Sequence, residues 1–321
     1  MSDVFVAKRA PRVIFFGMQS YFSVPCLRAL LRSAIEVCAV VIPMTLLPGQ
    51  SRSLPVIERR EPPSRRPRRP LLAMMPAGSD IVDLAWQNDI PLWEVHRLAH
   101  PETLAILAGY QADVICVACF PQRVPPALLN LPRLGCLNVH PSLLPANRGP
   151  LPLFWTFYEG DETTGVTIHL MNERMDSGDI LAQQEIRVRD GMRYEELEVL
   201  CTRLGGELLA RTVHDLYEGR VVRVPQDEAR SSSHSFPTDG EFVISAREWS
   251  ARRVYNFIRG STIWDRPVII VLDGRELVAQ DATSYSLDQE MVPMPGDAEE
   301  VGGEMMVSCK DGWVRVKLAG R

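Results

Sequence analysis

Short apolar runs alternate with stretches of helical periodicity in the first part of the chain. The run from Arg12 to Gly17 predicts a buried strand that ends at a glycine. A segment with Pro25 in its first turn and apolar residues on one face then predicts a helix. The apolar run from Glu36 to Ile42 completes a strand–helix–strand unit, and such units favour parallel sheets with right-handed crossovers. The pattern therefore predicts an α/β domain with a mostly parallel sheet.

The same alternation resumes after residue 80 and continues to residue 218. Periodicity predicts helices over residues 81–88, 101–109, 127–129, 153–158 and 194–218. Apolar runs predict strands over residues 90–95, 114–118, 135–140, 165–170 and 180–188. The last helix is followed by Gly219, a common helix terminator, and we expect it to close the first domain.

A polar, serine-rich stretch separates this part from a differently patterned C-terminus. Pro225 to Pro237 has the composition of a linker. Beyond it the pattern predicts a helix over residues 246–258 and short strands over residues 268–272, 276–279, 305–309 and 313–318. The length of 321 residues also exceeds what one core usually organises. We therefore predict a first domain at residues 1–224, a linker at 225–237 and a small β-rich barrel at 238–321.

Composition narrows the class of protein. The apolar content of 46% permits packed cores, and the net charge of −5 argues against a chain that coats nucleic acid or membrane through its overall field. Seven scattered cysteines give no disulfide framework, so a cytoplasmic location is expected, and Cys116 and Cys119 are interpreted as packing residues on a buried strand. No apolar segment reaches the length of about 18 residues that spans a membrane. A dinucleotide fingerprint is missing after the first strand.

One stretch without periodicity is strongly basic. Residues 43–76 are predicted to form a long, proline-rich loop. Its seven arginines are Arg52, Arg59, Arg60, Arg65, Arg66, Arg68 and Arg69. They have no packing role that their pattern reveals. A solvated segment is one interpretation, and capture of several phosphates by serial arginines is the other.

The candidate chemistry lies in the stretch GCLNVHPSLLPANRGP, from Gly135 to Pro150. Asn138 and His140 are two residues apart on a predicted strand, so their side chains leave the same face. Asp176, in the string MDSGDI, lies on the connection between two later strands, where a carboxylate can reach a neighbouring strand end. The structural alternative is a core asparagine beside a satisfied histidine.

Two further polar residues are given no catalytic role. Ser142 follows His140 by two residues, but it lacks the G-x-S-x-G elbow that a nucleophilic serine uses. His169 alternates with Ile168 and Leu170 on its strand. We therefore expect His169 to face the other side, as a packed or surface residue.

The string Asn138-x-His140-Pro-Ser-Leu-Leu-Pro145, followed by Arg148-Gly149 and by Asp176-Ser-Gly-Asp179, resembles the 10-formyltetrahydrofolate-dependent formyltransferases. The resemblance covers nearly the whole chain and is strongest from Gly135 to Ala182. It implies a Rossmann-like catalytic domain with the formyltransferase fold and a small OB-like β-barrel at the C-terminus. It also implies an enzyme that moves a formyl group from 10-formyltetrahydrofolate to a primary amine and needs no metal.

The resemblance also implies the site residues. Asn138, His140 and Asp176 match, residue by residue, the Asn, His and Asp that act together in the family. Their expected roles are oxyanion stabilisation by Asn138 and protonated His140, and proton removal from the amine by Asp176. The folate is expected at the carboxyl end of the 114–118 strand. Its expected contacts are Phe120, Pro121, Ser142, Leu143, Leu144 and Pro145.

The sequence leaves two candidates for the amine that accepts the formyl group. The two-domain layout resembles family members that formylate the methionyl amine of initiator tRNA, and this is the predicted acceptor. The predicted substrate-binding residues are Arg65, Arg66, Arg68, Arg69 and Arg148. Against this, residues 235–321 hold ten Arg and Lys but fourteen Asp and Glu. The string PANRGPLPLFW also resembles enzymes that act on amino-sugar nucleotides. An amino-sugar nucleotide or another small amine is therefore the alternative, and a non-catalytic folate- or RNA-binding protein is the remote one.

Overall fold

The structure, a computed structural model, describes residues 9–44, 54–62, 80–272, 274–288 and 294–320. The chain divides into two compact units. The first comprises residues 1–140, 166–184 and 202–229, and the second comprises residues 141–165, 185–201 and 230–321. In the described part of the chain, no helix combines the length and the apolarity that crossing a bilayer requires.

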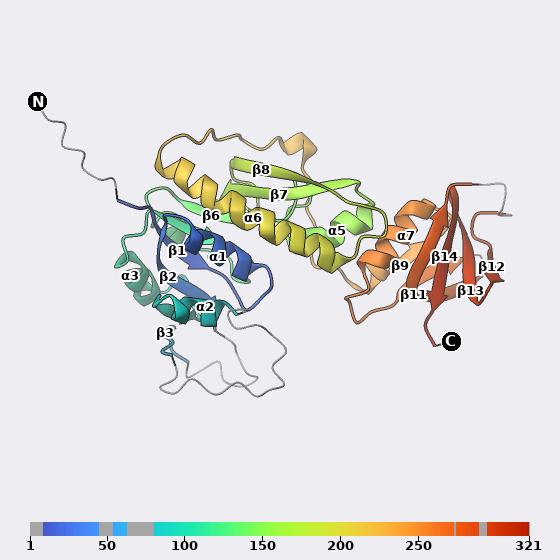
Figure 1. Cartoon of the computed structure of the whole chain (residues 1–321), viewed down its shortest axis with the longest axis horizontal. Coiled ribbons are helices and arrows are strands. Elements are labelled where there is room, and N and C mark those ends of the chain that lie inside the picture. Colours follow the sequence, from blue (N-terminus) through green and yellow to red (C-terminus); the bar gives the residue numbers. More distant parts are fainter. Residues whose placement is uncertain (1–8, 45–53, 63–79, 273, 289–293, 321) are drawn as a thin grey trace, which may run out of the picture. The chain divides into compact units, whose positions relative to one another are not determined.

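An eight-stranded sheet in the order β3-β4-β2-β1-β5-β6-β7-β8 runs through the first unit (Figure 1). Its parallel strands are β1 (Arg12–Phe16), β2 (Glu36–Pro43), β4 (Leu92–Val95), β5 (Val114–Val117) and β6 (Cys136–His140). The antiparallel β3 (Ile57–Arg59) and β7 (Thr163–Leu170) pair with β4 and β6, and β8 (Ile180–Arg187) lies beside β7. The predicted mostly parallel α/β sheet is confirmed. Its continuous apolar runs form central strands because both faces of a parallel sheet are covered.

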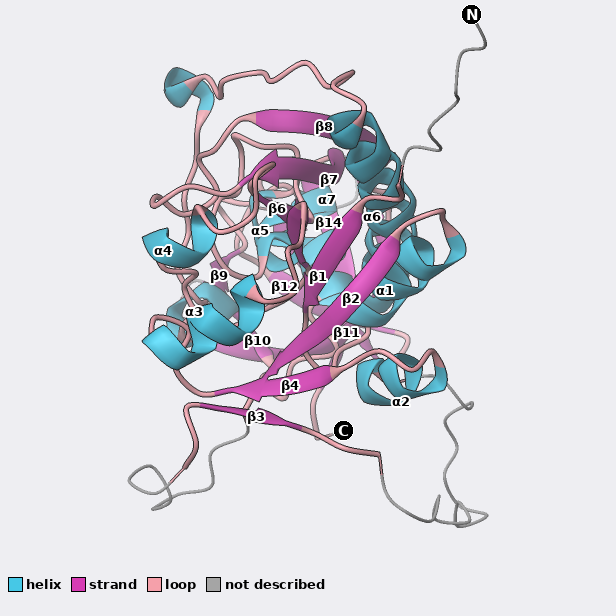
Figure 2. Cartoon of the chain, turned by 90° about the vertical axis from the view of Figure 1, so that its left-hand side faces the viewer, coloured by secondary structure: helices cyan, strands magenta, loops and turns pink. Residues whose placement is uncertain are grey.

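Helices supply that cover on both faces of the sheet (Figure 2). The helices α3 (Pro101–Ala108) and α4 (Pro126–Leu129) lie on one side, and α1 (Ser23–Arg32), α2 (Ile81–Gln87) and α6 (Tyr194–Tyr217) lie on the other. A core that includes Ile14, Phe16, Val41, Leu107, Ile115 and Leu128 is buried in the first unit. The helix α6 approaches the sheet closely at Gly205, where a Cβ would lie 2.9 Å from Cγ1 of Val139 on β6. This close approach holds β6, the strand of the candidate site, in place.

The second unit contains a sheet of its own. Its six strands, in the order β12-β13-β14-β11-β10-β9, are β9 (Val243–Ser245), β10 (Val268–Leu272), β11 (Arg275–Ser286), β12 (Ala298–Val301), β13 (Glu304–Cys309) and β14 (Gly312–Leu318). Two helices, α5 (Pro152–Glu159) and α7 (Ala251–Gly260), accompany it. Their aromatic rings pack together: Phe154 of α5 lies 5.7 Å from Phe257 of α7, and also 5.4 Å from Phe242, which precedes β9, centroid to centroid. The predicted β-rich C-terminal part is confirmed as a second sheet.

Four elements differ from the sequence prediction. The loop predicted over residues 43–76 contains the edge strand β3, which is too short for periodicity to reveal. The helix predicted from residue 246 begins at Ala251, because the Ser250 hydroxyl accepts a hydrogen bond from the Arg253 amide and caps it there. The strands β9 and β12 were not predicted, because the first has three residues and the second, Ala298–Val301, carries two glutamates.

Candidate active site

The strand β6 ends at the carboxyl edge of the sheet and carries two polar side chains on one face. Asn138 pairs with His169 of the antiparallel β7, and His140 pairs with Thr167. Directly paired residues of neighbouring strands point to the same face, so this register sets one polar row across the two strands. His140 is 4% exposed, and its backbone ends the strand before Pro141.

Asp176 reaches this row from the connection between β7 and β8. Its backbone has φ of 49°, a left-handed conformation that non-glycine residues adopt rarely. The side-chain amide of Gln226 donates to the carbonyl oxygens of Asp176 at 2.8 Å and Gly178 at 2.7 Å. The Leu170 amide donates to the Asp179 carbonyl at 2.9 Å and closes the turn. The surrounding hydrogen bonds therefore maintain a backbone conformation that carries strain.

The three predicted residues meet at the carboxylate of Asp176. The Asn138 amide nitrogen Nδ2 donates to Oδ1 at 3.4 Å, and Nδ1 of His140 lies 3.7 Å from Oδ2. The Asp176 side chain is 13% exposed, so these contacts form in a largely dehydrated place where charge–charge interactions are strong. An amide donor, an imidazole and a carboxylate together can stabilise a developing oxyanion and remove a proton from an amine. The catalytic roles of the three residues remain a prediction.

His169 also belongs to this cluster, and it is a packed residue, as predicted, although the sequence did not place it beside Asn138. Its Nε2 lies 3.5 Å from Oδ1 of Asp176 and 3.3 Å from Nδ2 of Asn138. The alternation argument was correct that His169 faces away from Ile168. It missed that this opposite face is the one that Asn138 shares, because the register between β6 and β7 decides that point. The antiparallel pairing of a histidine with Asn138 was the signal that could have found it.

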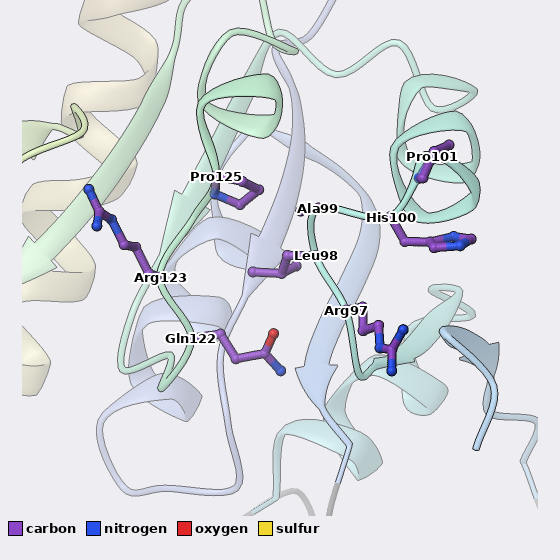
Figure 3. A pocket seen from close by; sticks show the side chains of 8 residues that line it. All are labelled: Arg97, Leu98, Ala99, His100, Pro101, Gln122, Arg123 and Pro125. Carbon is purple, nitrogen blue, oxygen red and sulfur yellow. The ribbon is translucent and has the colours of Figure 1, made fainter. Parts of the chain in front are cut away.

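The predicted folate residues Phe120 and Pro121 follow β5 at the same carboxyl edge. Directly after them, Gln122, Arg123 and Pro125 line a cavity of about 480 Å³. The side chains of Leu98 and Gln122 point into the space between the loop before α3 and the loop after β5, and Arg97 lies on the loop before α3 (Figure 3). The remaining lining residues are Arg97, Leu98, Ala99, His100 and Pro101, which precede and begin α3.

Arg123 connects this cavity loop to the Asp176 turn. Its guanidinium nitrogen Nη2 donates to the carbonyl oxygen of Glu173, three residues before Asp176. Gln122 in turn donates from Nε2 to the Val95 carbonyl at 3.2 Å. The loop after β5 is therefore fixed to β4 on one side and to the β7–β8 connection on the other.

The remaining predicted folate and substrate residues lie elsewhere in the chain. Ser142, Leu143, Leu144, Pro145 and Arg148 belong to the second unit. The Ser142 hydroxyl donates to the Ala146 carbonyl at 2.7 Å and so supports the turn of its own loop. The side chain of Arg148 is buried, and its backbone amide donates to the Ser232 carbonyl at 2.9 Å. The binding roles of these five residues remain a prediction.

The basic loop is described only in part. Arg65, Arg66, Arg68 and Arg69 lie outside the described residues. Arg59 pairs with Glu61 at 2.9 Å, whereas Arg60 pairs with Glu94 and lies 5.8 Å from the Trp86 ring centroid. The sequence pattern revealed no packing role for these arginines, and the structure adds one contact that it could not show: Arg60, next to β3, lies against β4 and α2.

The cysteines near the site differ from one another. Cys116 on β5 is fully buried, and burial raises the pKa of its thiol well above the ordinary value. Burial also raises the pKa of Cys136, on β6, to about 12. Both thiols therefore stay protonated and pack as apolar groups. Cys119 is exposed, two residues beyond the end of β5, so placing it on a buried strand was wrong.

A mostly parallel sheet with an amide, an imidazole and a carboxylate at its carboxyl edge is the arrangement of an α/β group-transfer enzyme. The chain belongs to the formyl transferase family, whose model matches residues 57–213. This confirms the predicted formyltransferase.

Relatives with curated names are similar over most of the chain. The methionyl-tRNA formyltransferase of Synechococcus sp. (strain JA-3-3Ab) is 35% identical over 253 residues, which are 77% of this chain and 70% of the relative. That of Synechocystis sp. (strain ATCC 27184 / PCC 6803 / Kazusa) is 34% identical over 276 residues, which are 84% of this chain and 76% of the relative. The high coverage extends the similarity into the C-terminal part.

Solved structures share the fold at low sequence identity. The sugar 3N-formyl transferase WlaRD superimposes with a TM-score of 0.66 at 12% identity, covering 98% of this chain and all of the other. The N-formyltransferase from Helicobacter canadensis, solved with folinic acid and dTDP-3-aminofucose, gives 0.63 at 14% identity, covering 96% and 99%. At these identities the comparison concerns the fold alone.

Proposed function

We propose that the protein transfers a formyl group from 10-formyltetrahydrofolate to the methionyl amine of initiator tRNA. The observation that carries the proposal is the convergence of Asn138 and His140 on the carboxylate of Asp176 in a chain of the formyl transferase family. The acceptor is supported by the names of the relatives from Synechococcus and Synechocystis.

In this reaction Asn138 and His140 stabilise the reacting oxygen, and Asp176 has two roles. The acceptor nitrogen forms a bond to the formyl carbon, the bond from that carbon to the folate nitrogen breaks, and that folate nitrogen takes up a proton in place of the one the amine loses. Asn138 Nδ2 and protonated His140 donate hydrogen bonds to the oxygen that becomes negative between the two events. Asp176 stabilises the charged ring of His140, from which it lies 3.7 Å, and accepts the proton that the amine loses.

The size and chemistry of the cavity lined by Gln122 and Pro125, directly after Phe120 and Pro121, support the proposed folate site. Its volume of about 480 Å³ is in the usual range for small-ligand sites. Leu98 and Pro125 supply apolar contact, and the guanidinium group of Arg97 suits a carboxylate of a folate tail. The protein would bind the folate along this loop, with the formyl end directed to Asp176.

A thermal-shift experiment tests the cosubstrate. A folate analogue should raise the melting temperature, because a ligand of the native state alone stabilises it by mass action, whereas NAD and ATP should not. Arg97→Ala should reduce the shift, and Arg203→Ala, an exposed arginine on α6, serves as the matched control. Stabilisation by NAD with none by folates would refute the assignment.

A salt titration tests the acceptor. If the acceptor is methionyl-tRNA, affinity should fall steeply with salt, and replacing Arg65, Arg66, Arg68 and Arg69 by Ala should flatten the log–log slope. Salt-sensitive binding that survives these four replacements would remove the loop from the mechanism. Absence of binding at low salt would favour the second candidate, an amino-sugar nucleotide, which the shared fold with WlaRD supports.

The finer architecture is part of the same proposal. We place the catalytic domain at residues 1–224, the linker at 225–237 and an OB-like closure of the C-terminal sheet at 238–321. The enzyme would act in the cytoplasm, where charged initiator tRNA and reduced folate occur together. Limited proteolysis with cleavage confined to the linker would support these boundaries.

A further inference from the structure

His169 is a buried histidine whose polar contacts all belong to the candidate site or to its own strand. It is 1% exposed. Its Nε2 faces Asp176 Oδ1 at 3.5 Å and Asn138 Nδ2 at 3.3 Å, and its Nδ1 lies 2.9 Å from the Leu170 carbonyl oxygen. The predicted roles of Asn138, His140 and Asp176 assign no function to His169.

The contact with Leu170 fixes the tautomer of this ring. A carbonyl oxygen only accepts, so Nδ1 of His169 must carry a hydrogen. Nε2 therefore has two states. Without a proton it accepts a hydrogen bond from Asn138, and with a proton it donates one to Asp176.

In the described part of the chain, Asp176 and His140 are the titratable groups recorded beside His169. Asp176, on the β7–β8 connection, presents Oδ1 to His169 and Oδ2 to His140. The ring of His140, on β6, lies 6.4 Å from that of His169, centroid to centroid, and Asn138 is neutral. One carboxylate thus separates two imidazoles. A second positive charge beside His140 is unfavourable unless a negative charge appears nearby at the same time.

Formyl transfer supplies that negative charge at the right moment. We propose that His169 is a positioning residue that acts through Asp176 and temporarily holds the proton removed from the attacking amine. This inference rests on the proposed function. As the new C–N bond forms, the amine proton moves to Asp176 and on to Nε2 of His169, while the formyl oxygen becomes negative. When the bond to the folate nitrogen breaks, the same proton returns through Asp176 to that nitrogen, so no proton is gained or lost overall.

Two replacements separate proton holding from simple packing. His169→Gln keeps an amide that can donate to Asp176 but cannot hold the proton, and His169→Phe removes both properties. Each should lower kcat by about tenfold to a hundredfold with little change in KM, and each should change the shape of the pH–rate profile. His214→Gln, on α6 and without a place in the site, is the matched control. A His169→Gln enzyme with wild-type kcat and an unchanged profile would overturn the proposal.

A spectroscopic measurement judges the same residue without turnover. In imidazole ¹⁵N NMR of the full chain, His169 should appear with its proton on Nδ1, and its Nε2 signal should move when Asp176→Asn removes the anionic neighbour. A proton on Nε2 alone, unaffected by that replacement, would overturn the inference. If the wild type transferred no formyl group while the NMR result held, the proposed function would fail and the assigned hydrogen bonding of His169 would stand.

Discussion

Asp176 is the residue on which the polar side chains of the site converge. One oxygen faces Asn138 and His169, and the other faces His140. A single carboxylate therefore sets the orientation of an amide and two imidazoles. Loss of its charge should affect proton removal and oxyanion stabilisation together, which makes the effects of the individual residues interdependent.

We predict that Asn138→Ala, His140→Ala and Asp176→Asn each lower kcat at least about a hundredfold, because each removes an interaction with charge that develops in the transition state. The double variants should lose far less than the product of the single losses. Steady-state kinetics measures this, and circular dichroism checks that the variants fold. Formyl transfer by His140→Ala at a near wild-type rate would exclude His140 as the oxyanion donor.

The residues that the sequence predicted are those whose placement depends on local geometry. Asn138 and His140 share a face because they are two apart on one strand, and Asp176 follows a strand in a turn-forming string. The position of His169 depends on which residue of β6 lies opposite it, and its own alternation says nothing of that register. The left-handed backbone of Asp176 was equally invisible, because no glycine marks it.

At the scale of elements, the turn between β7 and β8 is the part that positions the carboxylate. A Cβ on Gly178 would lie 1.8 Å from the Leu170 carbonyl oxygen, so this position excludes every larger residue without a shift of the backbone. Gln226 joins the turn from outside it through two hydrogen bonds of 2.8 and 2.7 Å. The turn is thus constrained by its close contact with Leu170 and by the hydrogen bonds from Gln226.

Gln226→Ala should lower kcat by about tenfold to a hundredfold, since a small displacement of a reacting group is that costly. The melting temperature should change little, because only side-chain hydrogen bonds on a turn are lost. Gln280→Ala, an exposed glutamine of β11, is the control. An unchanged kcat in Gln226→Ala would mean that the turn keeps Asp176 in place without the two hydrogen bonds from Gln226.

A second polar cluster, in the second unit, predicts a pH dependence of stability. The Tyr285 hydroxyl donates to Asp190 at 2.6 Å, and this hydrogen bond, with burial, raises the pKa of Tyr285 to about 12. A phenol whose pKa is raised on folding stabilises the native state fully below the unfolded value of about 10 and loses that contribution as the pH rises. The free energy of unfolding should therefore decrease between about pH 10 and 12. Denaturant titrations should show a weaker decrease in Tyr285→Phe, but an unaltered one in the exposed-tyrosine control Tyr21→Phe. Equal slopes in wild type and Tyr285→Phe would contradict this.

Asp190 predicts a loss of stability at acidic pH. Burial raises the pKa of its carboxyl, but hydrogen bonds from Tyr285 and Asn256 and the charge of Arg252 outweigh burial and leave the pKa below the usual value. A carboxyl with a lowered folded-state pKa stabilises the protein above its unfolded value and loses that contribution as the pH falls through the folded-state pKa. Asp190→Asn should thus be less stable than wild type at neutral pH, with the difference narrowing in acid. A difference that stays constant from neutral pH into acid would show that the Asp190 charge plays no part.

The elements predicted most clearly from the sequence were those with long apolar runs or strong helical periodicity, such as β2 and α6. Short or polar edge strands could not be predicted, because three or four residues carry too little pattern and their pairing partner decides their conformation. For β3 that partner is β4, about 35 residues further along the chain. Its pairing places Arg60 against Glu94, a contact that the composition of the loop concealed.

At the scale of the whole molecule, the net charge and its distribution do not favour RNA binding by the whole surface. The chain has a net charge of −5, and residues 235–321 contribute ten basic and fourteen acidic side chains. The relatives with curated names are nevertheless methionyl-tRNA formyltransferases, while solved structures with the same fold include enzymes of amino sugars. If the acceptor is a tRNA, we predict that the basic residues of the 43–76 segment supply much of the attraction to its phosphates.

The most direct measurement is the rate of formyl transfer from 10-formyltetrahydrofolate to two acceptors offered in parallel, charged initiator methionyl-tRNA and a nucleotide-linked amino sugar. The account predicts that the tRNA is formylated with a kcat/KM at least about a hundredfold higher, and that Asp176→Asn abolishes nearly all of this activity. Preferred formylation of the amino sugar would contradict the proposed acceptor. Transfer to neither, with the folded wild-type protein and intact cosubstrate, would contradict the proposed function itself.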